Sequence, residues 1–285
     1  MLKDSQNFIK DGGLVLKLLE MVHIPSDSCV IEIGPGKGII TDKLVARYRE
    51  VITIEADVRF YQTLKVRYEN IPNVHLVCGD FLKYQLPDKA FNVISNIPFN
   101  ITADIVKKIT AIGSHLESAY LIMQRSAAEK FAGGYGQGTP LLSNFLQVDY
   151  EIKILTTIKR DAFVPRPKYD AVFILFQKRK KSILEGKESL WFKDFLSYLF
   201  DRSKPSLGES LTTLLSKRQT AILLENLSLN EDLMIKQVKF LEWVDIYSST
   251  RAIPGMNIER VVSGSYSKLI SQQSRIRKIH RTRRY

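Results

Sequence analysis

The sequence predicts an α/β protein with a doubly wound, mostly parallel sheet, followed by a small helical domain. Up to about residue 178, short β-branched runs alternate with longer stretches of helical periodicity, which is the pattern of parallel βαβ units. A basic cluster, Lys-Arg-Lys-Lys at residues 178–181, ends the last of these runs, and helical periodicity dominates after it. We therefore expect an α/β domain over residues 1–181, a helical domain over 182–270 and a basic tail over 271–285.

Seven short apolar runs are expected to form the strands of the sheet. They span residues 29–33, 51–55, 74–78, 91–95, 118–123, 150–158 and 171–177. Helical periodicity lies between the early runs, over residues 39–47, 58–69 and 102–112. The last two runs are joined by an irregular stretch instead of a helix, which favours an antiparallel hairpin at one edge of the sheet.

The predicted helical domain begins with an apolar stripe at helical spacing. Its members are Trp191, Phe192, Phe195, Leu196 and Leu199. We interpret this stripe as core and not as a surface for binding bases. Residues 206–209, Ser-Leu-Gly-Glu, have the pattern of a capping box and predict a further helix that continues through Leu211, Leu214 and Leu215.

The composition is ordinary for a soluble globular protein, with 45% hydrophobic and 25% charged residues in a chain of 285. No apolar stretch approaches the roughly 18 residues of a membrane span, and the N-terminal residues do not have the pattern of a signal peptide. Cys29 and Cys78 lie in strand-like runs and are expected to be buried, reduced thiols. The four histidines show no metal-ligand spacing, so we expect no metal site. We expect a cytoplasmic monomer.

The net charge of +12 is concentrated at the end of the chain. After Glu259, the last acidic residue, come eight basic residues and no acidic one. A polyanion is the natural partner of such a tail, because neutralised phosphates release counterions. A solubilising tail or a membrane-surface segment is the alternative, but residues 275–280 contain few large apolar side chains for a membrane anchor. We therefore expect nucleic acid as the partner.

A glycine-rich turn follows the first expected strand, in the sequence Glu-Ile-Gly-Pro-Gly-Lys-Gly over residues 32–38. Its glycines, Gly34, Gly36 and Gly38, allow a sharp turn and close approach of a ligand to the backbone. Their spacing matches neither the dinucleotide fingerprint nor the P-loop. Glu55 ends the second strand, 21 residues after Gly34, where a carboxylate can accept both hydroxyls of a ribose.

Two further groups follow at the ends of the third and fourth expected strands. Asp80 can accept a hydrogen bond from an adenine amino group, with Phe81 packing nearby. The tetrad Asn-Ile-Pro-Phe at residues 96–99 offers an amide carbonyl, a proline without an N–H, and an aromatic face for a base. Each group alone is compatible with a helix cap or a turn. The carboxyl ends of adjacent parallel strands meet at one edge of the sheet. The glycine turn, Glu55, Asp80 and the tetrad, each at the end of a successive strand, therefore predict an adenosine site beside an amine acceptor.

In this combination the residues resemble the rRNA adenine N6-methyltransferases, which include the erythromycin-resistance (Erm) enzymes of large-subunit RNA and the dimethyladenosine transferases of small-subunit RNA. The match extends over nearly the whole chain. It includes residues 5–8 (Ser-Gln-Asn-Phe), 32–38, 55, 79–80, 96–99 and 163–168 (Phe-Val-Pro-Arg-Pro-Lys). The resemblance implies S-adenosylmethionine as cofactor and a class I methyltransferase fold, Rossmann-like with a mostly parallel seven-stranded sheet.

The resemblance also implies roles for individual residues. Gln6, Asn7 and the glycine turn would surround the methionine part of the cofactor, while Glu55 would hold the ribose and Asp80 the adenine. The expected cofactor-binding set is completed by Phe8, Ala56, Phe81 and Asn96. In catalysis, Asn96 and the carbonyl of Ile97, held beside Pro98, would accept hydrogen bonds from the target N6 amine. Phe99 would stack on the flipped base and Phe163 would close its other side.

The Ile of the tetrad and the Ser-Gln-Asn-Phe start resemble the Erm branch, whereas the small-subunit branch usually has Leu and Tyr in the tetrad. We therefore expect an enzyme that methylates an adenine of 23S rRNA and confers macrolide-type antibiotic resistance. The alternatives are a 16S rRNA adenine dimethyltransferase and a non-catalytic RNA-binding or transcription factor on the same fold. Residues 133–139 are expected to form a mobile loop near the site, with no assigned role.

Overall fold

The computed structural model describes residues 7–133, 141–202 and 204–275 and divides into two compact units. Unit 1 comprises Met1–Ala132 and Tyr150–Lys180, and unit 2 comprises Gly133–Asp149 and Lys181–Tyr285. The expected boundary after residue 181 lies one residue from the second junction. The sequence reading did not place α6 (Leu141–Asp149) with the helical unit, which it joins because its Phe145 and Val148 belong to that core.

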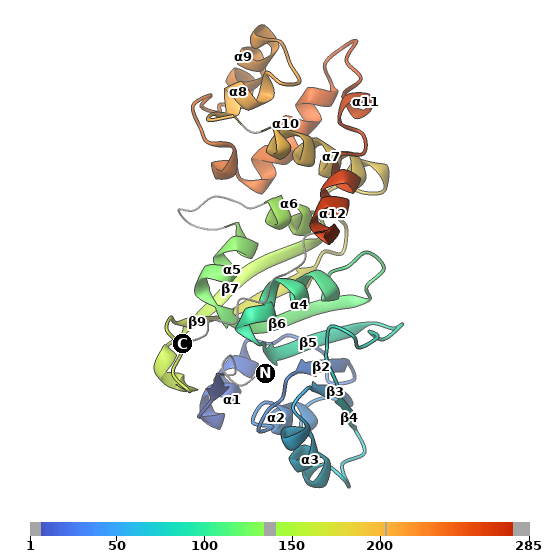
Figure 1. Cartoon of the computed structure of the whole chain (residues 1–285), viewed down its shortest axis with the longest axis vertical. Helices are drawn as coiled ribbons and strands as arrows, with labels where there is room; N and C mark the ends of the chain where they lie inside the picture. The colour runs from blue at the N-terminus through green and yellow to red at the C-terminus, as the bar shows by residue number, and fades with distance from the viewer. Residues whose placement is uncertain (1–6, 134–140, 203, 276–285) are drawn as a thin grey trace. The chain divides into compact units, whose positions relative to one another are not determined.

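Unit 1 is built on a seven-stranded sheet with the order β4-β3-β2-β5-β6-β9-β7 (Figure 1). Its strands are β2 (Cys29–Ile33), β3 (Glu50–Glu55), β4 (Val74–Cys78), β5 (Phe91–Asn96), β6 (Leu116–Gln124), β7 (Tyr150–Ile158) and β9 (Ala171–Lys178). The strands from β4 to β6 are parallel, and β9 pairs antiparallel with both β6 and β7. The doubly wound fold, the seven strands and the hairpin at one edge are thereby confirmed.

The helices of unit 1 cover both faces of this sheet. They are α1 (Gly12–Glu20), α2 (Thr41–Val45), α3 (Val58–Arg67), α4 (Thr102–Ile109) and α5 (Arg125–Ala132). Buried side chains of α1 and α2 share a core with β2, β5 and β6 on one face. On the opposite face, Phe131 of α5 meets Phe176 of β9 with ring centroids 5.7 Å apart. The helices expected over residues 39–47, 58–69 and 102–112 are present as α2, α3 and α4.

A second, two-stranded sheet joins the N-terminal segment to a distant part of unit 1. β1 (Phe8–Ile9) pairs antiparallel with β8 (Phe163–Val164), which lies in the connection between β7 and β9. Ile9 and Phe163 are opposite each other in this pair and both are buried. The amide of Lys10 also donates to the carbonyl of Ala162 at 3.0 Å. We call residues 7–10 the N-terminal strap.

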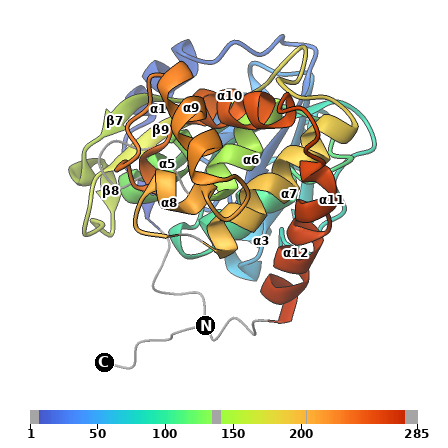
Figure 2. The ribbon, with the colours of Figure 1, turned by 90° about the horizontal axis from the view of Figure 1, so that it is seen from above.

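Unit 2 is helical in its described residues, as the periodicity predicts, and Figure 2 shows its helices from above. After α6 come α7 (Lys187–Asp201), α8 (Leu207–Leu211), α9 (Lys217–Asn226), α10 (Phe240–Arg251), α11 (Ile258–Val262) and α12 (Ser265–Arg275). The stripe on α7 is core, as expected, because Phe192, Phe195, Leu196 and Leu199 are fully buried and Trp191 packs against them.

Three details of the sequence reading differ from the structure. The hydroxyl of Ser206 accepts from the amide of Glu209 as a cap, but α8 ends at Leu211 and does not continue through Leu214 and Leu215. Helix α12 extends to Arg275 and so includes the start of the expected basic tail, whose residues 276–285 lie outside the described part. Cys29 is buried as expected, but Cys78 is exposed. Cys78 lies on β4, which is an edge strand of the sheet.

The described residues contain no helix long and apolar enough to cross a membrane. They also contain no group of three or more His, Cys, Asp or Glu side chains that could hold a metal ion.

Candidate active site

The strands β2 and β5 separate at the carboxyl edge of the sheet, where the strand order reverses. Their ladder pairs only Val30 with Asn92 and Ile31 with Val93. Beyond it, the buried hydroxyl of Ser95 donates to the carbonyl of Ile33 at 2.7 Å and accepts from its amide at 3.2 Å. This side chain replaces the missing ladder bonds and fixes the spacing of the two strand ends. Ligands of open α/β sheets bind at such a switch point.

The glycine turn after β2 forms one wall of this opening. Gly34, Gly36 and Gly38 all have positive φ, at 66°, 56° and 81°. A Cβ on Gly36 would collide with the ring of Phe8, and one on Gly38 would lie 2.8 Å from Leu64 Cδ2. Around Gly34 there is no heavy atom within 4 Å of a built Cβ. The turn therefore needs glycine for its backbone, and it leaves open space on the side of Gly34.

Glu55 lies beneath the turn at the end of β3. Its Oε2 accepts from the amide of Gly36 at 2.9 Å and its Oε1 from the amide of Asp57 at 2.8 Å. The side chain is buried, and this burial raises the pKa of Glu55 above its usual value. The carboxylate thus holds the turn in place, and each oxygen keeps a lone pair for a further donor such as a hydroxyl. Ala56, the next residue, is exposed.

Asp80 lies at the end of the neighbouring strand β4 and is exposed. Its Oδ1 accepts from the amide of Leu82 at 2.8 Å, which fixes the side chain and leaves the second oxygen for a ligand. Gly79 has no heavy atom within 4 Å of a built Cβ, so the space beside Asp80 is open. Phe81 is buried, with Lys108 Nζ 5.6 Å from the centre of its ring. It supports the strand end from within.

Asn96, the last residue of β5, carries an oriented amide. Its Nδ2 donates to the carbonyl of Asn7 at 2.6 Å. Its Oδ1 is buried and has no hydrogen-bond partner among the described residues. Since the bond to Asn7 determines which end of the amide is nitrogen, the free group is an acceptor and not a donor. A buried acceptor left without a partner costs free energy and indicates a place where a ligand supplies the donor.

The N-terminal strap connects the separate parts of the site. Asn7 binds the amide of Asn96, and Phe8 covers Gly36 and meets Phe60 edge-on at 5.3 Å between ring centroids. The structure therefore brings Asn7 and Phe8 to the glycine turn and the tetrad, where the sequence places them. Gln6, the other expected cofactor residue of this segment, lies outside the described residues, as do residues 134–139 of the expected loop.

The two aromatic walls expected for the target base differ in exposure. Phe99 is half-buried, next to the buried Ile97 and the half-buried Pro98. Phe163 is fully buried in the core that also contains Ile9. Its ring presents no open face in this structure, because the pairing of β1 with β8 places it inside unit 1. The stacking role expected for Phe163 therefore has no support from its position.

Glu32 is a residue whose importance the sequence reading missed. It is buried in the all-buried strand β2, and its Oε2 accepts from the Thr41 hydroxyl of α2 at 2.6 Å. Burial raises the pKa of Glu32 to about 8, although the Thr41 hydrogen bond lowers it. The bond ties the two ends of the glycine turn together. The sequence signal that could have identified Glu32 is a carboxylate within an otherwise apolar strand, Cys-Val-Ile-Glu-Ile.

Stability should therefore depend on pH through Glu32. Between its ordinary pKa of 4.5 and its folded value of about 8, the folded chain holds a proton that the unfolded chain has released. The free energy of unfolding should fall as pH rises through this window, by up to about 1.4 kcal/mol per pH unit. Urea unfolding at several pH values should show a steeper decline for the wild type than for Glu32→Gln. Parallel pH profiles would contradict this assignment.

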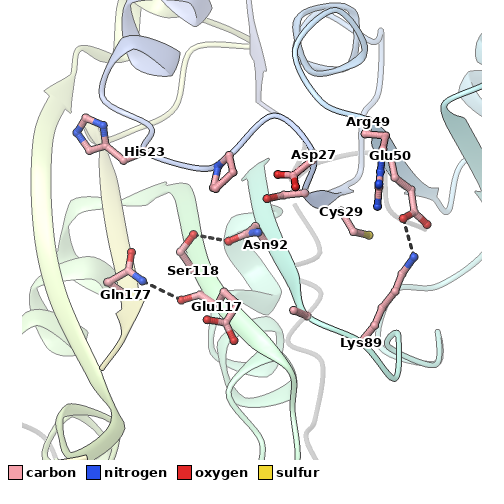
Figure 3. A pocket seen from close by; sticks show the side chains of 13 residues that line it. His23, Asp27, Cys29, Arg49, Glu50, Lys89, Asn92, Glu117, Ser118 and Gln177 are labelled. Atoms are coloured by element: carbon pink, nitrogen blue, oxygen red, sulfur yellow. Dashed lines mark hydrogen bonds and ion pairs between the residues drawn. The ribbon is translucent and has the colours of Figure 1, made fainter. Parts of the chain in front are cut away.

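A cavity of about 420 Å³ lies at the opposite, amino end of the sheet (Figure 3). Polar side chains line it, and three pairs of these residues are bonded, one of them from Gln177 Nε2 to the carbonyl of Glu117 at 3.2 Å. The hydroxyl of Ser118 donates to Asn92 Oδ1 at 2.7 Å, and Lys89 forms an ion pair with Glu50 at 2.6 Å. None of the residues predicted to bind the cofactor or the base lines this cavity.

Comparisons with known proteins show the family of the chain. The ribosomal RNA adenine dimethylase family matches residues 2–251 of the chain. The ribosomal RNA small subunit methyltransferase A of Fusobacterium nucleatum is 28% identical, covering 86% of this chain and 96% of the relative. An rRNA adenine N-6-methyltransferase of Bacillus licheniformis is 24% identical, covering 86% and 85%. The crystal structure of the 23S rRNA methyltransferase ErmE is similar with a TM-score of 0.78 at 25% identity, covering 85% and 98%.

The family match extends over far more than half of the chain, and the seven-stranded sheet is that of the expected methyltransferase fold. The chain belongs to the ribosomal RNA adenine dimethylase family and is an S-adenosylmethionine-dependent rRNA adenine methyltransferase.

Proposed function

We propose that this enzyme methylates the N6 amine of an adenine in 23S rRNA and thereby confers resistance to macrolide-type antibiotics. The observation that carries the N6 chemistry is the buried, unpartnered Oδ1 of Asn96. The choice of 23S rRNA is supported by the Ile of the tetrad and by Ser-Gln-Asn-Phe at residues 5–8, which resemble the Erm branch. The similarity to a structure described as a 23S rRNA methyltransferase supports the same choice.

Dimethylation of 16S rRNA is the second candidate function. One observation supports it as strongly as the similarity to the 23S rRNA methyltransferase supports the first. The relative from Fusobacterium nucleatum is named a small subunit methyltransferase and is covered over 96% of its length. The Phe at position 99 does not decide between the two, because it retains the stacking face of the Tyr that is usual in the small-subunit branch.

The residues present fit S-adenosylmethionine. The space beside Gly34 and Gly79 is open, and the carboxylates of Glu55 and Asp80 have acceptor capacity left at adjacent strand ends. We propose that Glu55 accepts from the ribose, Asp80 from the adenine amine, and that the strap residues Asn7 and Phe8 close the methionine end. When bound, the cofactor supplies an electrophilic methyl group on a sulfonium.

The protein's part in the reaction is to prepare the amine. The lone pair of an adenine N6 is delocalised into the ring, so the amine is a poor nucleophile. Asn96 Oδ1, with the carbonyl of Ile97, accepts its two hydrogens and draws the nitrogen towards tetrahedral geometry. Phe99 stacks on the flipped base and offsets part of the cost of unstacking. Catalysis then consists of positioning and electrostatics, without a covalent enzyme intermediate.

The experiment that tests the target is methyl transfer from labelled S-adenosylmethionine to protein-free 23S rRNA and to 16S-containing particles, with the modified position mapped. We expect label in a single region of 23S rRNA and none in 16S. Label in 16S alone would replace the first candidate by the second. Absence of transfer to both would contradict the two candidates together.

A further inference from the structure

The connection between β7 and β9, residues 159–170, lies at the same edge of the sheet as Asn96. Asn96 pairs with Ile122 of β6, and Ile122 pairs with Phe173 of β9. Tyr169 precedes Phe173 by four residues. Two strand spacings of about 4.8 Å and four residues of about 3.3 Å, taken at right angles to each other, place Tyr169 about 16 Å from Asn96. The connection is therefore within reach of nucleotides close to a base bound at the tetrad.

Tyr169 is unusual among the aromatic residues of this protein. Its side chain is 57% exposed. Every other Phe, Tyr or Trp side chain in residues 7–133, 141–202 and 204–272 is buried or half-buried. Lys168 Nζ lies 5.3 Å from the centre of its ring, a distance at which a cation is attracted to an aromatic face. Exposure of one large aromatic ring in a protein whose other described rings are buried or half-buried indicates a contact with a partner.

The connection that carries Tyr169, residues 159–170, has an excess of positive charge, with four basic and two acidic residues. Lys159, Arg160 and Lys168 are exposed, and their side chains form no ion pair with other described residues. Arg166 of the same connection is paired with Asp161 at 2.6 Å. Free cations beside an exposed aromatic ring are the combination that binds single-stranded nucleic acid, with phosphates on the cations and a base on the ring.

We propose that Tyr169 stacks on an unpaired base of the substrate RNA, a few nucleotides from the target adenine, while Lys168 and its cationic neighbours hold the adjoining phosphates. This inference rests on the proposed function only in taking RNA as the substrate. It assigns to Tyr169 a contact that lies outside the methyl-transfer site.

Three substitutions of Tyr169 test the contact in the full chain. The probe is a fluorescent single-stranded oligoadenylate, with duplex RNA of equal length as the comparison. Tyr169→Ala and Tyr169→Leu should each weaken single-strand binding by at least about fivefold, the lower end of the effect of one stacked base. Tyr169→Phe should bind within about twofold of the wild type. Ile112→Ala, which alters a 90% exposed apolar side chain after α4, should change nothing.

Salt titration separates stacking from charge. Tyr169→Ala should leave the salt slope of RNA binding unchanged, whereas Lys168→Gln should reduce it by about one ion. The KM for rRNA should rise in Tyr169→Ala, with cofactor affinity as in the wild type.

The proposal is overturned if Tyr169→Ala binds the single strand like the wild type. It is also overturned if Tyr169→Phe loses as much affinity as Tyr169→Ala, because the hydroxyl and not the ring would then make the contact. An equal loss for duplex RNA would contradict binding to an unpaired base. A wild-type enzyme that binds the oligonucleotide with these differences but methylates no rRNA would overturn the proposed function and leave the Tyr169 contact standing.

Discussion

Asn96→Ala should lower the rate of methyl transfer by at least about a hundredfold and leave S-adenosylmethionine affinity nearly unchanged. This loss of rate is the one expected when a single preorganised hydrogen-bonding group is removed from a water-excluded site. We expect the amide to act on the target amine through Oδ1, because its Nδ2 is bound to the Asn7 carbonyl and Oδ1 has no partner among the described residues. Single-turnover transfer to rRNA and calorimetric titration with the cofactor measure the two quantities separately.

Two further substitutions control this prediction. Asn96→Asp retains an oxygen acceptor but loses the donor to the Asn7 carbonyl. The side chain should then no longer be held in its orientation, and the rate of methyl transfer should fall by a similar factor. Asn100→Ala, at an exposed position four residues later, should transfer methyl groups at the wild-type rate. Equal losses of rate and cofactor affinity in Asn96→Ala would assign Asn96 a structural role instead.

Gly36→Ala should be the most damaging change in the glycine turn. Its φ of 56° costs an alanine about 1–2 kcal/mol, and the collision with the Phe8 ring adds about 1–3 kcal/mol as for an overpacked core. Displacement of Phe8 or of the turn should also reduce cofactor affinity by at least about tenfold. Urea unfolding and calorimetric titration with S-adenosylmethionine measure the two effects.

A matched control separates strain from collision. Gly113 has a φ of 82°, and no heavy atom lies within 4 Å of a Cβ placed there. Gly113→Ala should therefore cost only the backbone strain of about 1–2 kcal/mol. In a double-mutant cycle, Gly36→Ala should cost less in the Phe8→Ala background, by the energy of the collision. If Gly36→Ala is no more destabilising than Gly113→Ala, the strap does not pack on the turn as described.

The parts of the fold that the sequence predicted are those set by local pattern. All seven strands of the large sheet coincide with apolar, β-branched runs, and α3 begins after Asp57, whose carboxylate caps it. Helix α1 was not predicted, since it starts at Gly12 and Gly13, which favour turns. Helix α6 was not assigned to unit 2, because contacts and not sequence order decide which core a segment joins.

The parts of the site that the sequence could not supply depend on distant contacts. Asn96 was identified from its tetrad, but the direction of its amide depends on Asn7, which is 89 residues away. Phe163 matched a motif, yet its pairing with Ile9 buries the ring. The pKa of Glu32 depends on complete burial, and no local pattern measures burial. Residue types at strand ends were therefore predictable, whereas their exposure and orientation were not.

The central claim is that Asn96 presents its Oδ1 to the N6 amine of an adenine. The most direct test is mass spectrometry of nucleosides from rRNA incubated with the enzyme and S-adenosylmethionine. The wild type should produce adenosine methylated at N6, and Asn96→Ala should produce none above background while still binding the cofactor. Methyl groups on a ring carbon or on the ribose would contradict the account, as would N6 methylation at the wild-type rate by Asn96→Ala.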